Sequence, residues 1–318
     1  MPAPDHVIRR DGIHLFFDPD EPPRLRVKSG DRIRVETEDA GMGSVRSERD
    51  VYASIGELFE KLGGANPVTG PIFVEGVAPG DCVAITIEDI VPGAVQHQGY
   101  TALTPGIGGL IGRYGLQDDL PPRTVICPIE DKIIKFPARG GFIDIPVSPF
   151  LGTIGVAPAQ ERRLAFSQGA DFGGNTDIPL HGIGATLVFR ANVAGALISL
   201  GDAHAAQGDG EIAGAAVECQ ADVTLLVERI AAADAHYVAL PQVNTETFIG
   251  SVAGLGGVNL GDTVRSAYVD IIRRLERFHG FSRDEAYLLA CQTAKVRIGQ
   301  VVDPLYSAAV TIERRYIQ

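Results

Sequence analysis

Two segments that lie 50 residues apart repeat one pattern, and this pattern restricts the fold more than any other feature of the chain. Each begins with a Gly-Asp turn, at Gly30 and at Gly80, and continues as a run of alternating apolar and polar residues that ends in acids. Alternation with a period of two is typical of a strand with one buried face, and Gly-Asp is a turn signal. Residues 24–38 and 74–90 are therefore predicted to form two similar β-units.

The remaining runs extend this pattern. Turn residues separate short apolar or alternating runs, which predict further strands near 125–135, 142–147, 185–190, 195–200, 214–229, 236–240 and 307–313. Helical spacing of apolar residues predicts one helix opened by Ser47 and closed by Gly63, a second from Thr263 to Phe278, and a third that follows the capping box Ser282–Glu285 and reaches about Gly299.

The predicted fold class is α+β, predominantly β. Residues 1–240 are expected to form a β-sandwich or barrel-like catalytic core, which two packed β-units could build, and residues 241–318 an α+β portion. The 38 glycines and 20 prolines agree with a fold rich in turns.

Charge and hydropathy restrict the partners. The formal net charge is −12 and the chain has no Lys/Arg cluster that could follow phosphates, so we expect no nucleic acid partner. No apolar run approaches the roughly 20 residues of a membrane span, and the N-terminus lacks a signal-peptide pattern, so we expect a cytoplasmic protein. Four scattered cysteines, with no CxxC pair, suit a reducing compartment and are predicted to be small core residues.

The segment 201–211 (GDAHAAQGDGE) carries the strongest chemical signal. It places Asp202 and His204 two residues apart, directly after an apolar run, so both side chains should point to the same side of a strand end. A carboxylate and an imidazole that converge among small residues suit a bound metal ion or a proton-transfer pair. Asp209 and Glu211 are interpreted as residues that shape the following turn.

Two other acids stand in comparable surroundings. Asp177 follows Asn175 in a glycine-rich turn. Glu75 follows Ile72, Phe73 and Val74, and an acid buried in such a strand needs a partner or has a raised pKa. Such acids are common at functional sites, although structural ion pairs give the same signal.

These motifs together resemble the acetamidase/formamidase family of amide hydrolases, over nearly the whole chain. The resemblance rests on residues 66–71 (NPVTGP) with Glu75, 149–156 (PFLGTIGV), 173–177 (GGNTD) and 200–211 followed by Glu218. It implies a β-rich fold, assembly into a homo-oligomer, a divalent metal with zinc as the first expectation, and hydrolysis of a small amide substrate to an acid and ammonia. Calcium or manganese would also suit an acid-rich site.

A mechanistic hypothesis assigns roles to seven residues. The metal ligands are predicted to be Asp39, Asp177, Asp202 and His204, with Glu75 as general base and then general acid. Asn175 or Gln207 is expected to donate a hydrogen bond to the developing oxyanion.

Other functions stay open at this point. The substrate could be a cyclic amide, that is, a lactam. The chain could also be a non-catalytic β-rich protein that binds a metal or a small ligand. A thiol amidase is disfavoured because no cysteine has a Glu–Lys neighbourhood.

Overall fold

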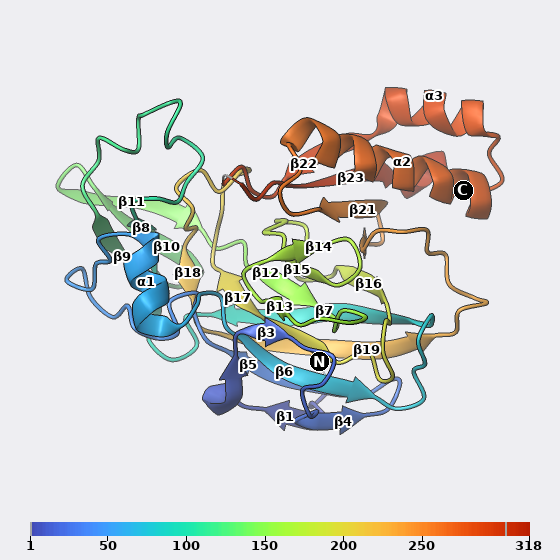
Figure 1. The fold of residues 1–318 in the computed structure, drawn as a ribbon, viewed down its shortest axis with the longest axis horizontal. Coiled ribbons are helices and arrows are strands. Elements are labelled where there is room, and N and C mark those ends of the chain that lie inside the picture. Colours follow the sequence, from blue (N-terminus) through green and yellow to red (C-terminus); the bar gives the residue numbers. More distant parts are fainter. Residues whose placement is uncertain (1, 303) are drawn as a thin grey trace.

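Two large β-sheets form most of the molecule (Figure 1). The computed structural model describes residues 2–302 and 304–318. The nine-stranded sheet has the order β1 (His6–Ile8), β5 (Arg32–Thr37), β19 (Ala221–Ile230), β7 (Cys82–Pro92), β16 (Thr186–Arg190), β20 (Gln242–Asn244), β21 (Phe248–Gly254), β23 (Ser307–Glu313) and β22 (Lys295–Ile298).

The second sheet has twelve strands. Its main path is β11 (Gly141–Pro146), β10 (Ile133–Ala138), β9 (Arg123–Glu130), β8 (Gln98–Leu103), β18 (Glu218–Cys219), β17 (Ile198–His204), β12 (Phe150–Gly155), β15 (Gly173–Asn175) and β14 (Gln168–Gly169). Beside β17 lies β6 (Val68–Val74), which also pairs with β2 (Ile13–His14) and β4 (Leu25–Val27), while β3 (Phe16–Phe17) and β13 (Arg163–Leu164) form a separate pair.

One hydrophobic core joins the two large sheets. Ile33, Ile85 and Leu225 of the nine-stranded sheet belong to the same buried cluster as Leu151 and Ile198 of the twelve-stranded sheet. The side chains alternate along each strand, as in β5, where every second residue is buried. This packing makes a β-sandwich and fixes the position of the strand ends that carry the polar residues described below.

Three α-helices complete the described part of the chain, with short 3₁₀ turns at Arg10–Gly12 and Arg314–Tyr316. The short helix α1 (Ile55–Leu62) lies near β8 and β9, whereas α2 (Leu260–Phe278) and α3 (Arg283–Thr293) lie beside β21 and β23 (Figure 1). Helix α2 packs Ile271 and Leu275 into a second core that the sheet completes with residues such as Val310. The strands of residues 241–318 thus continue the sheet that the first 240 residues begin.

The predicted fold class is confirmed: the molecule is mostly strand, with its longest helix in the C-terminal part. The strand predicted at 307–313 has the same bounds as β23, and the capping box of Ser282 and Glu285 is present.

Two predicted helix boundaries and one predicted strand are wrong. Helix α1 begins at Ile55 under a Ser54 cap, because Ser47 and Asp50 close a separate turn through their own hydrogen bonds. Helix α3 ends at Thr293, since residues 295–298 pair with β23 as β22. Residues 236–240 form no strand.

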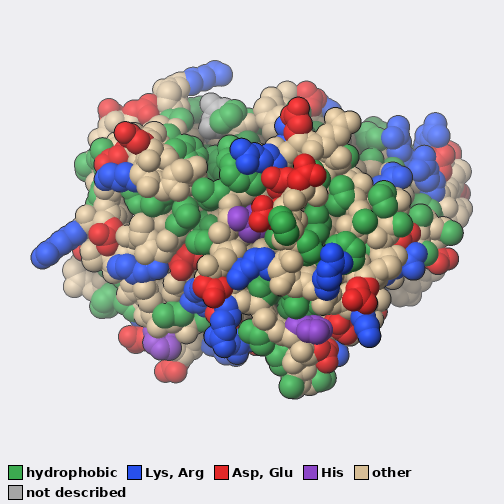
Figure 2. Space-filling model, turned by 60° about the horizontal axis from the view of Figure 1, so that its bottom comes forward, with side chains coloured by type: hydrophobic (Ala, Val, Ile, Leu, Met, Phe, Trp, Pro, Cys, Tyr) green, Lys and Arg blue, Asp and Glu red, His purple; other side chains and the backbone are tan. Residues whose placement is uncertain are grey.

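The surface is mixed in charge. Figure 2 shows acidic, basic and hydrophobic side chains interspersed over one face of the molecule. Among the described residues, no helix has both the length and the apolar character needed to cross a membrane. Cys82, Cys127 and Cys219 are buried, as predicted, but Cys291 is exposed on α3.

Candidate active site

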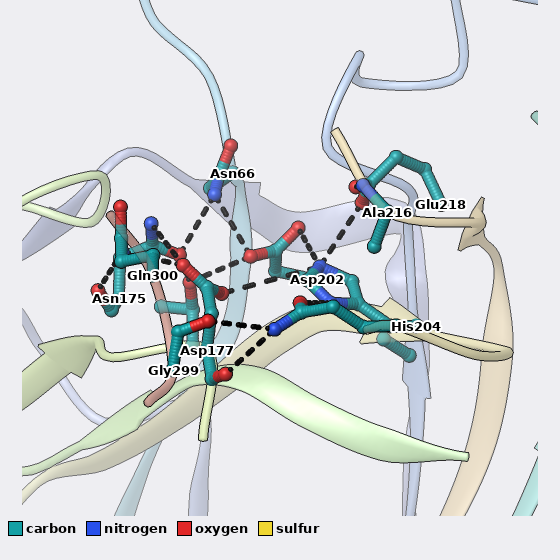
Figure 3. Close-up of polar contacts among 12 residues, drawn as sticks. Asn66, Asn175, Asp177, Asp202, His204, Ala216, Glu218, Gly299 and Gln300 are labelled. Carbon is teal, nitrogen blue, oxygen red and sulfur yellow. Dashed lines mark hydrogen bonds and ion pairs between the residues drawn. The ribbon is translucent and has the colours of Figure 1, made fainter. Parts of the chain in front are cut away.

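Four buried side chains converge where β17 ends and β18 begins. Asp202 and His204 come from β17, Glu218 from β18, and Asp177 from the turn after β15. At most 2% of each residue is exposed. The Nε2 atom of His204 lies 3.4 Å from Asp202 Oδ1, 3.2 Å from Glu218 Oε2 and 4.0 Å from Asp177 Oδ1 (Figure 3). Apart from these contacts within the cluster, the four atoms have no hydrogen-bond partner.

The second oxygen of each carboxylate accepts hydrogen bonds from neutral donors. One oxygen of each group therefore stays fixed while the other is free to face the common centre. Asp202 Oδ2 accepts a hydrogen bond from Asn66 Nδ2 at 2.8 Å. Asp177 Oδ2 accepts from Asn175 Nδ2 at 3.1 Å and from Gln300 Nε2 at 2.5 Å. Glu218 Oε1 accepts from the N–H group of Ala216 at 2.8 Å.

Gln207 orients the imidazole in the same way. Its amide nitrogen donates to the carbonyl oxygens of Asp177 and Gly299, at 3.0 and 2.9 Å, which leaves its Oε1 to accept a hydrogen bond from His204 Nδ1 at 2.9 Å. A proton on Nδ1 leaves the lone pair of the neutral ring on Nε2, toward the three carboxylates. The ring is thus presented in the tautomer that binds a cation.

The backbone around the cluster is unusual. Asp177, Asp202 and Glu211 have φ values of 48°, 53° and 45°, in the left-handed region that residues with a Cβ seldom adopt. Such conformations persist where the surroundings enforce them and are frequent at functional sites. Gly152 of β12 provides room: a methyl group on it would overlap Asp177 Oδ1 and Asp202 Oδ2.

Burial and mutual charge perturb the titration of the cluster. Burial raises the pKa of Glu218 to about 7. Burial, together with the charge of Asp202, raises the pKa of Asp177 well above its ordinary value. Burial by itself lowers the pKa of His204, but the carboxylates of Glu218 and Asp202 raise that pKa well above its usual range. The cluster without a cation therefore retains protons at neutral pH.

The donor set fits a divalent cation. Buried polar atoms without partners are costly, and here four of them face one centre. Ligand atoms of Asp177, Asp202 and His204 lie within 4.8 Å of one another, and so do those of His204, Glu211 and Glu218. Carboxylate oxygens with an imidazole nitrogen are ligands that zinc accepts.

A cavity adjoins the cluster. Its volume is about 70 Å³, and Asn66, Glu211 and Glu218 lie in its wall. Glu211 is only partly buried, and burial together with the charge of Asp177 raises its pKa well above the ordinary value. A small molecule in this cavity would therefore contact an acid that can carry a proton.

The structure does not bring Asp39 to the cluster. Asp39 follows β5 of the nine-stranded sheet, and both of its oxygens are occupied: Oδ1 accepts from the N–H groups of Gly41 and Gly43, and Oδ2 binds Arg46 at 2.8 Å. Burial raises its pKa to about 6 despite Arg46. Asp39 thus shapes the loop that lines the cavity, and its predicted role as a ligand is not supported.

Glu75 is also misplaced by the sequence prediction. Strand β6 ends at Val74, and Glu75 lies exposed in the turn that follows. The opposite end of β6 pairs with the part of β17 that leads to Asp202, through Val68 and Gly201. Glu75 follows Val68 by seven positions, a distance of about 23 Å along an extended chain at ~3.3 Å per residue. The prediction of a buried Glu75 is wrong, and a role at this site is not supported.

Asn175 and Gln207 are in the site but in other roles than predicted. The oxygen of Asn175 accepts from Asn66 and Thr153, and its nitrogen donates to Asp177. The nitrogen of Gln207 is used by two backbone carbonyls. Both side chains hold other site residues in place, so neither is presented as an oxyanion donor.

Glu218 and Glu211 are the acids whose roles were missed. Glu218 pairs directly with His204 across β17 and β18, a signal that needs the strand register and not the sequence alone. Glu211 reaches the cavity, whereas Asp209, from the same turn, binds Arg297 at 2.7 Å.

Fold and site together define a β-rich protein with a buried carboxylate–imidazole centre beside a small cavity. The family model described as "Acetamidase/Formamidase family" matches residues 5–169 and 167–313, and the chain belongs to this family.

Solved relatives share the whole fold. An acetamidase from Bacillus halodurans is 30% identical and superposes with a TM-score of 0.86, covering 98% of each chain. An acetamidase from Yersinia enterocolitica is 31% identical with a TM-score of 0.89, covering 98% of this chain and 93% of that one. A formamidase from Methylophilus methylotrophus is 27% identical over 63% of this chain, and the match spans 59% of the formamidase. The chain thus matches less than two thirds of the length of the curated formamidases.

Proposed function

We propose that this protein hydrolyses a small carboxamide to a carboxylic acid and ammonia. The observation that carries the proposal is the convergence of four ligand atoms, from Asp177, Asp202, His204 and Glu218, that have no hydrogen-bond partner outside their own cluster, in a chain of this family. The adjoining cavity of about 70 Å³ is of a size for a small substrate.

Asp177, Asp202 and His204 would hold a divalent cation, zinc being the first choice, with manganese or calcium as alternatives. Glu218 adds a fourth oxygen beside His204 Nε2. When bound, such an ion polarises an amide carbonyl and lowers the pKa of water. The protein contributes the fixed orientation of the donors, through Gln207 at the imidazole and Asn66 at Asp202.

Glu211 is the proposed proton carrier because it lies in the cavity wall and beside the cluster. Its carboxylate takes a proton from the attacking water as the new C–O bond forms at the amide carbon. The same carboxyl group then gives a proton to the leaving nitrogen as the C–N bond breaks, so that ammonia and a carboxylic acid result. A raised pKa suits a group that both accepts and donates in one cycle.

Ammonia release from a panel of short amides tests the proposal. The protein is assayed as purified, after treatment with a chelator, and after zinc or manganese is restored, with metal content measured on the same samples. We expect turnover that follows metal content. A fully metal-loaded protein that releases no ammonia from any linear amide or from 2-pyrrolidone would contradict it.

Two Glu→Gln variants separate an enzyme from a binding protein. Glu211→Gln should keep the fold and the metal but lose 10²-fold or more in kcat, as is typical for removal of a general acid–base group. Glu75→Gln makes the same chemical change on the exposed turn after β6 and should behave as wild type. Equal activity in the two variants would remove Glu211 from the mechanism.

A homo-oligomer is part of the proposal. Val269 of α2 and Tyr287 of α3 line one groove, with 47% and 64% of their surfaces exposed, and Leu288 beside them is 61% exposed. Neighbouring exposed apolar side chains of this kind suit a subunit contact. Sedimentation of wild type and Tyr287→Glu tests this contact, and a monomeric wild type would exclude it.

A further inference from the structure

Tyr100 of β8 belongs to the same cross-strand row of side chains as two members of the cluster. Residues directly opposite each other on neighbouring antiparallel strands have their side chains on the same face of the sheet. His204 of β17 is opposite Glu218 of β18, and Glu218 is opposite Tyr100. Because neighbouring strands lie about 4.8 Å apart, Tyr100 stands one strand beyond Glu218, on the face that carries the cluster.

The hydroxyl end of Tyr100 lies at the wall of the cavity. Tyr100, Gly41 and Glu218 all line this cavity. A methyl group on Gly41 would lie 2.8 Å from the Tyr100 hydroxyl oxygen and 3.4 Å from Oδ1 of Asp39. Tyr100 is only 7% exposed, so its hydroxyl faces the cavity and this loop. The loop that Asp39 shapes therefore fixes the position of the Tyr100 hydroxyl at the cavity wall.

The amide donors at this end of the cavity are already used by the protein. Asn66 Nδ2 donates to Asn175 Oδ1 and to Asp202 Oδ2, both at 2.8 Å. Gln300 Nε2 donates to the backbone oxygen of Asn175 and to a carboxylate oxygen of the cluster. Among the residues that the structure describes, the Tyr100 hydroxyl donates its proton to no acceptor. A phenol is protonated at neutral pH, and burial raises the pKa of Tyr100 further, so this donor is available to a bound molecule.

We propose that Tyr100 is a catalytic residue whose hydroxyl donates a hydrogen bond to the carbonyl oxygen of the bound amide. The inference rests on the proposed amidase activity. As the oxygen of water bonds to the amide carbon, the π electrons of the carbonyl group move onto its oxygen. A donor that is fixed beforehand stabilises this charge more than it stabilises the neutral amide. Tyr100 keeps its proton, unlike Glu211, and takes the role that the sequence suggested for Asn175 or Gln207.

Tyr100→Phe removes the hydroxyl and keeps the ring. With acetamide and the metal-loaded enzyme, kcat should fall by about 10²-fold or more while KM changes little, as is typical for the loss of an oxyanion donor. Metal content and thermal unfolding should match wild type. Tyr52→Phe is the matched control and should keep most of the activity, because Tyr52 borders the same cavity but its hydroxyl is hydrogen-bonded to Ser44 at 2.7 Å.

Thioacetamide separates a direct hydrogen bond from a structural effect. Its sulfur replaces the carbonyl oxygen and is a weak hydrogen-bond acceptor, so the hydroxyl contributes less to its hydrolysis. Ammonia release from acetamide and from thioacetamide is measured for wild type and Tyr100→Phe. The loss in kcat/KM caused by the substitution should be about tenfold larger for acetamide. Any preference of the metal for sulfur is common to both proteins and cancels in this comparison.

The outcomes distinguish this inference from the proposed function. Wild-type kcat in Tyr100→Phe, or equal losses with acetamide and thioacetamide, would overturn the inference and leave the amidase proposal intact. A loss of activity that follows a loss of bound metal would make Tyr100 a structural residue and would also overturn it. A metal-loaded wild type that releases no ammonia from any amide would instead remove the amidase proposal, and this inference with it.

Discussion

The side-chain oxygen of Gln207 accepts a hydrogen bond from Nδ1 of His204 at 2.9 Å, and this contact determines which nitrogen of the imidazole faces the acids. The rest of Gln207 is fixed by two backbone carbonyls, so its amide cannot turn over without losing both bonds. The orientation of His204, a proposed metal ligand, therefore depends on Gln207, whose side chain does not itself reach the centre of the cluster.

Gln207→Ala is expected to weaken metal binding by 10- to 100-fold, the usual effect of removing the partner of a metal-bound histidine. Gln207→Glu keeps an acceptor for Nδ1–H and should bind metal more tightly than Gln207→Ala. Competition titration with a chromogenic chelator gives both affinities. Wild-type affinity in the alanine variant would mean that the hydrogen bond does not orient the ring.

Gly152 supports a second prediction, because the space beside its Cα is taken by the carboxylates of Asp177 and Asp202. Gly152→Ala should displace one or both groups, lower the metal content, and cost about 1–3 kcal/mol of stability through overpacking. Gly141→Ala is the control, since a methyl group there meets nothing within 4 Å. Metal analysis and thermal unfolding of the two variants should differ, and a fully metal-loaded Gly152→Ala would show that the carboxylates need not lie where the structure has them.

The sequence alone predicts the relative placement of those site residues whose positions depend on the local strand periodicity. Asp202 and His204 are two apart at a strand end, and their ligand atoms do lie 3.4 Å apart. The sequence indicates similar chemistry in the turn that carries Asp177, but only the pairing of β12 with β15 and with β17 brings this turn to Asp202 and His204.

The positions of the remaining residues depend on contacts that the sequence pattern alone does not show. In the sequence, Glu218 is one polar position in an alternating run. Its contact with His204 depends on the register between β17 and β18. Glu75 was misassigned because an apolar run does not reveal where a strand ends, and β6 ends one residue before it. Both carboxylate oxygens of Asp39 accept hydrogen bonds from residues close in sequence, which are Gly41, Gly43 and Arg46. Only the geometry of the loop shows these hydrogen bonds.

Metal binding should depend on pH through the same cluster. Glu218 has a pKa of about 7 in the metal-free protein, and His204 has a raised pKa, so both hold protons that a cation must displace. As pH falls through 7, the apparent metal affinity is expected to fall, by about tenfold per pH unit for each displaced proton. Affinities measured between pH 5.5 and 8.5 check this expectation. A metal affinity that does not change over this pH range would exclude proton competition by these groups.

His181 predicts a separate effect of pH, on stability and not on the site. It is 3% exposed, and burial lowers its pKa to about 4 from 6.5. Between these two values the unfolded chain binds a proton that the folded chain does not, so acidification favours unfolding. This contribution is absent above pH 6.5 and grows to a destabilisation of about 3 kcal/mol at pH 4.

Denaturant unfolding of chelated wild type and His181→Gln, at several pH values from 7.5 to 4.5, isolates this effect. Other titrating groups are common to both proteins, so the difference in their slopes reports His181 alone. The variant loses stability at pH 7.5 from altered packing, but its stability should fall less steeply with acidification. Parallel pH profiles for the two proteins would mean that His181 takes up its proton in the folded state as readily as in the unfolded chain. That outcome would require a water molecule or a carboxylate beside the imidazole, whose Nδ1 has no hydrogen-bond partner in this structure.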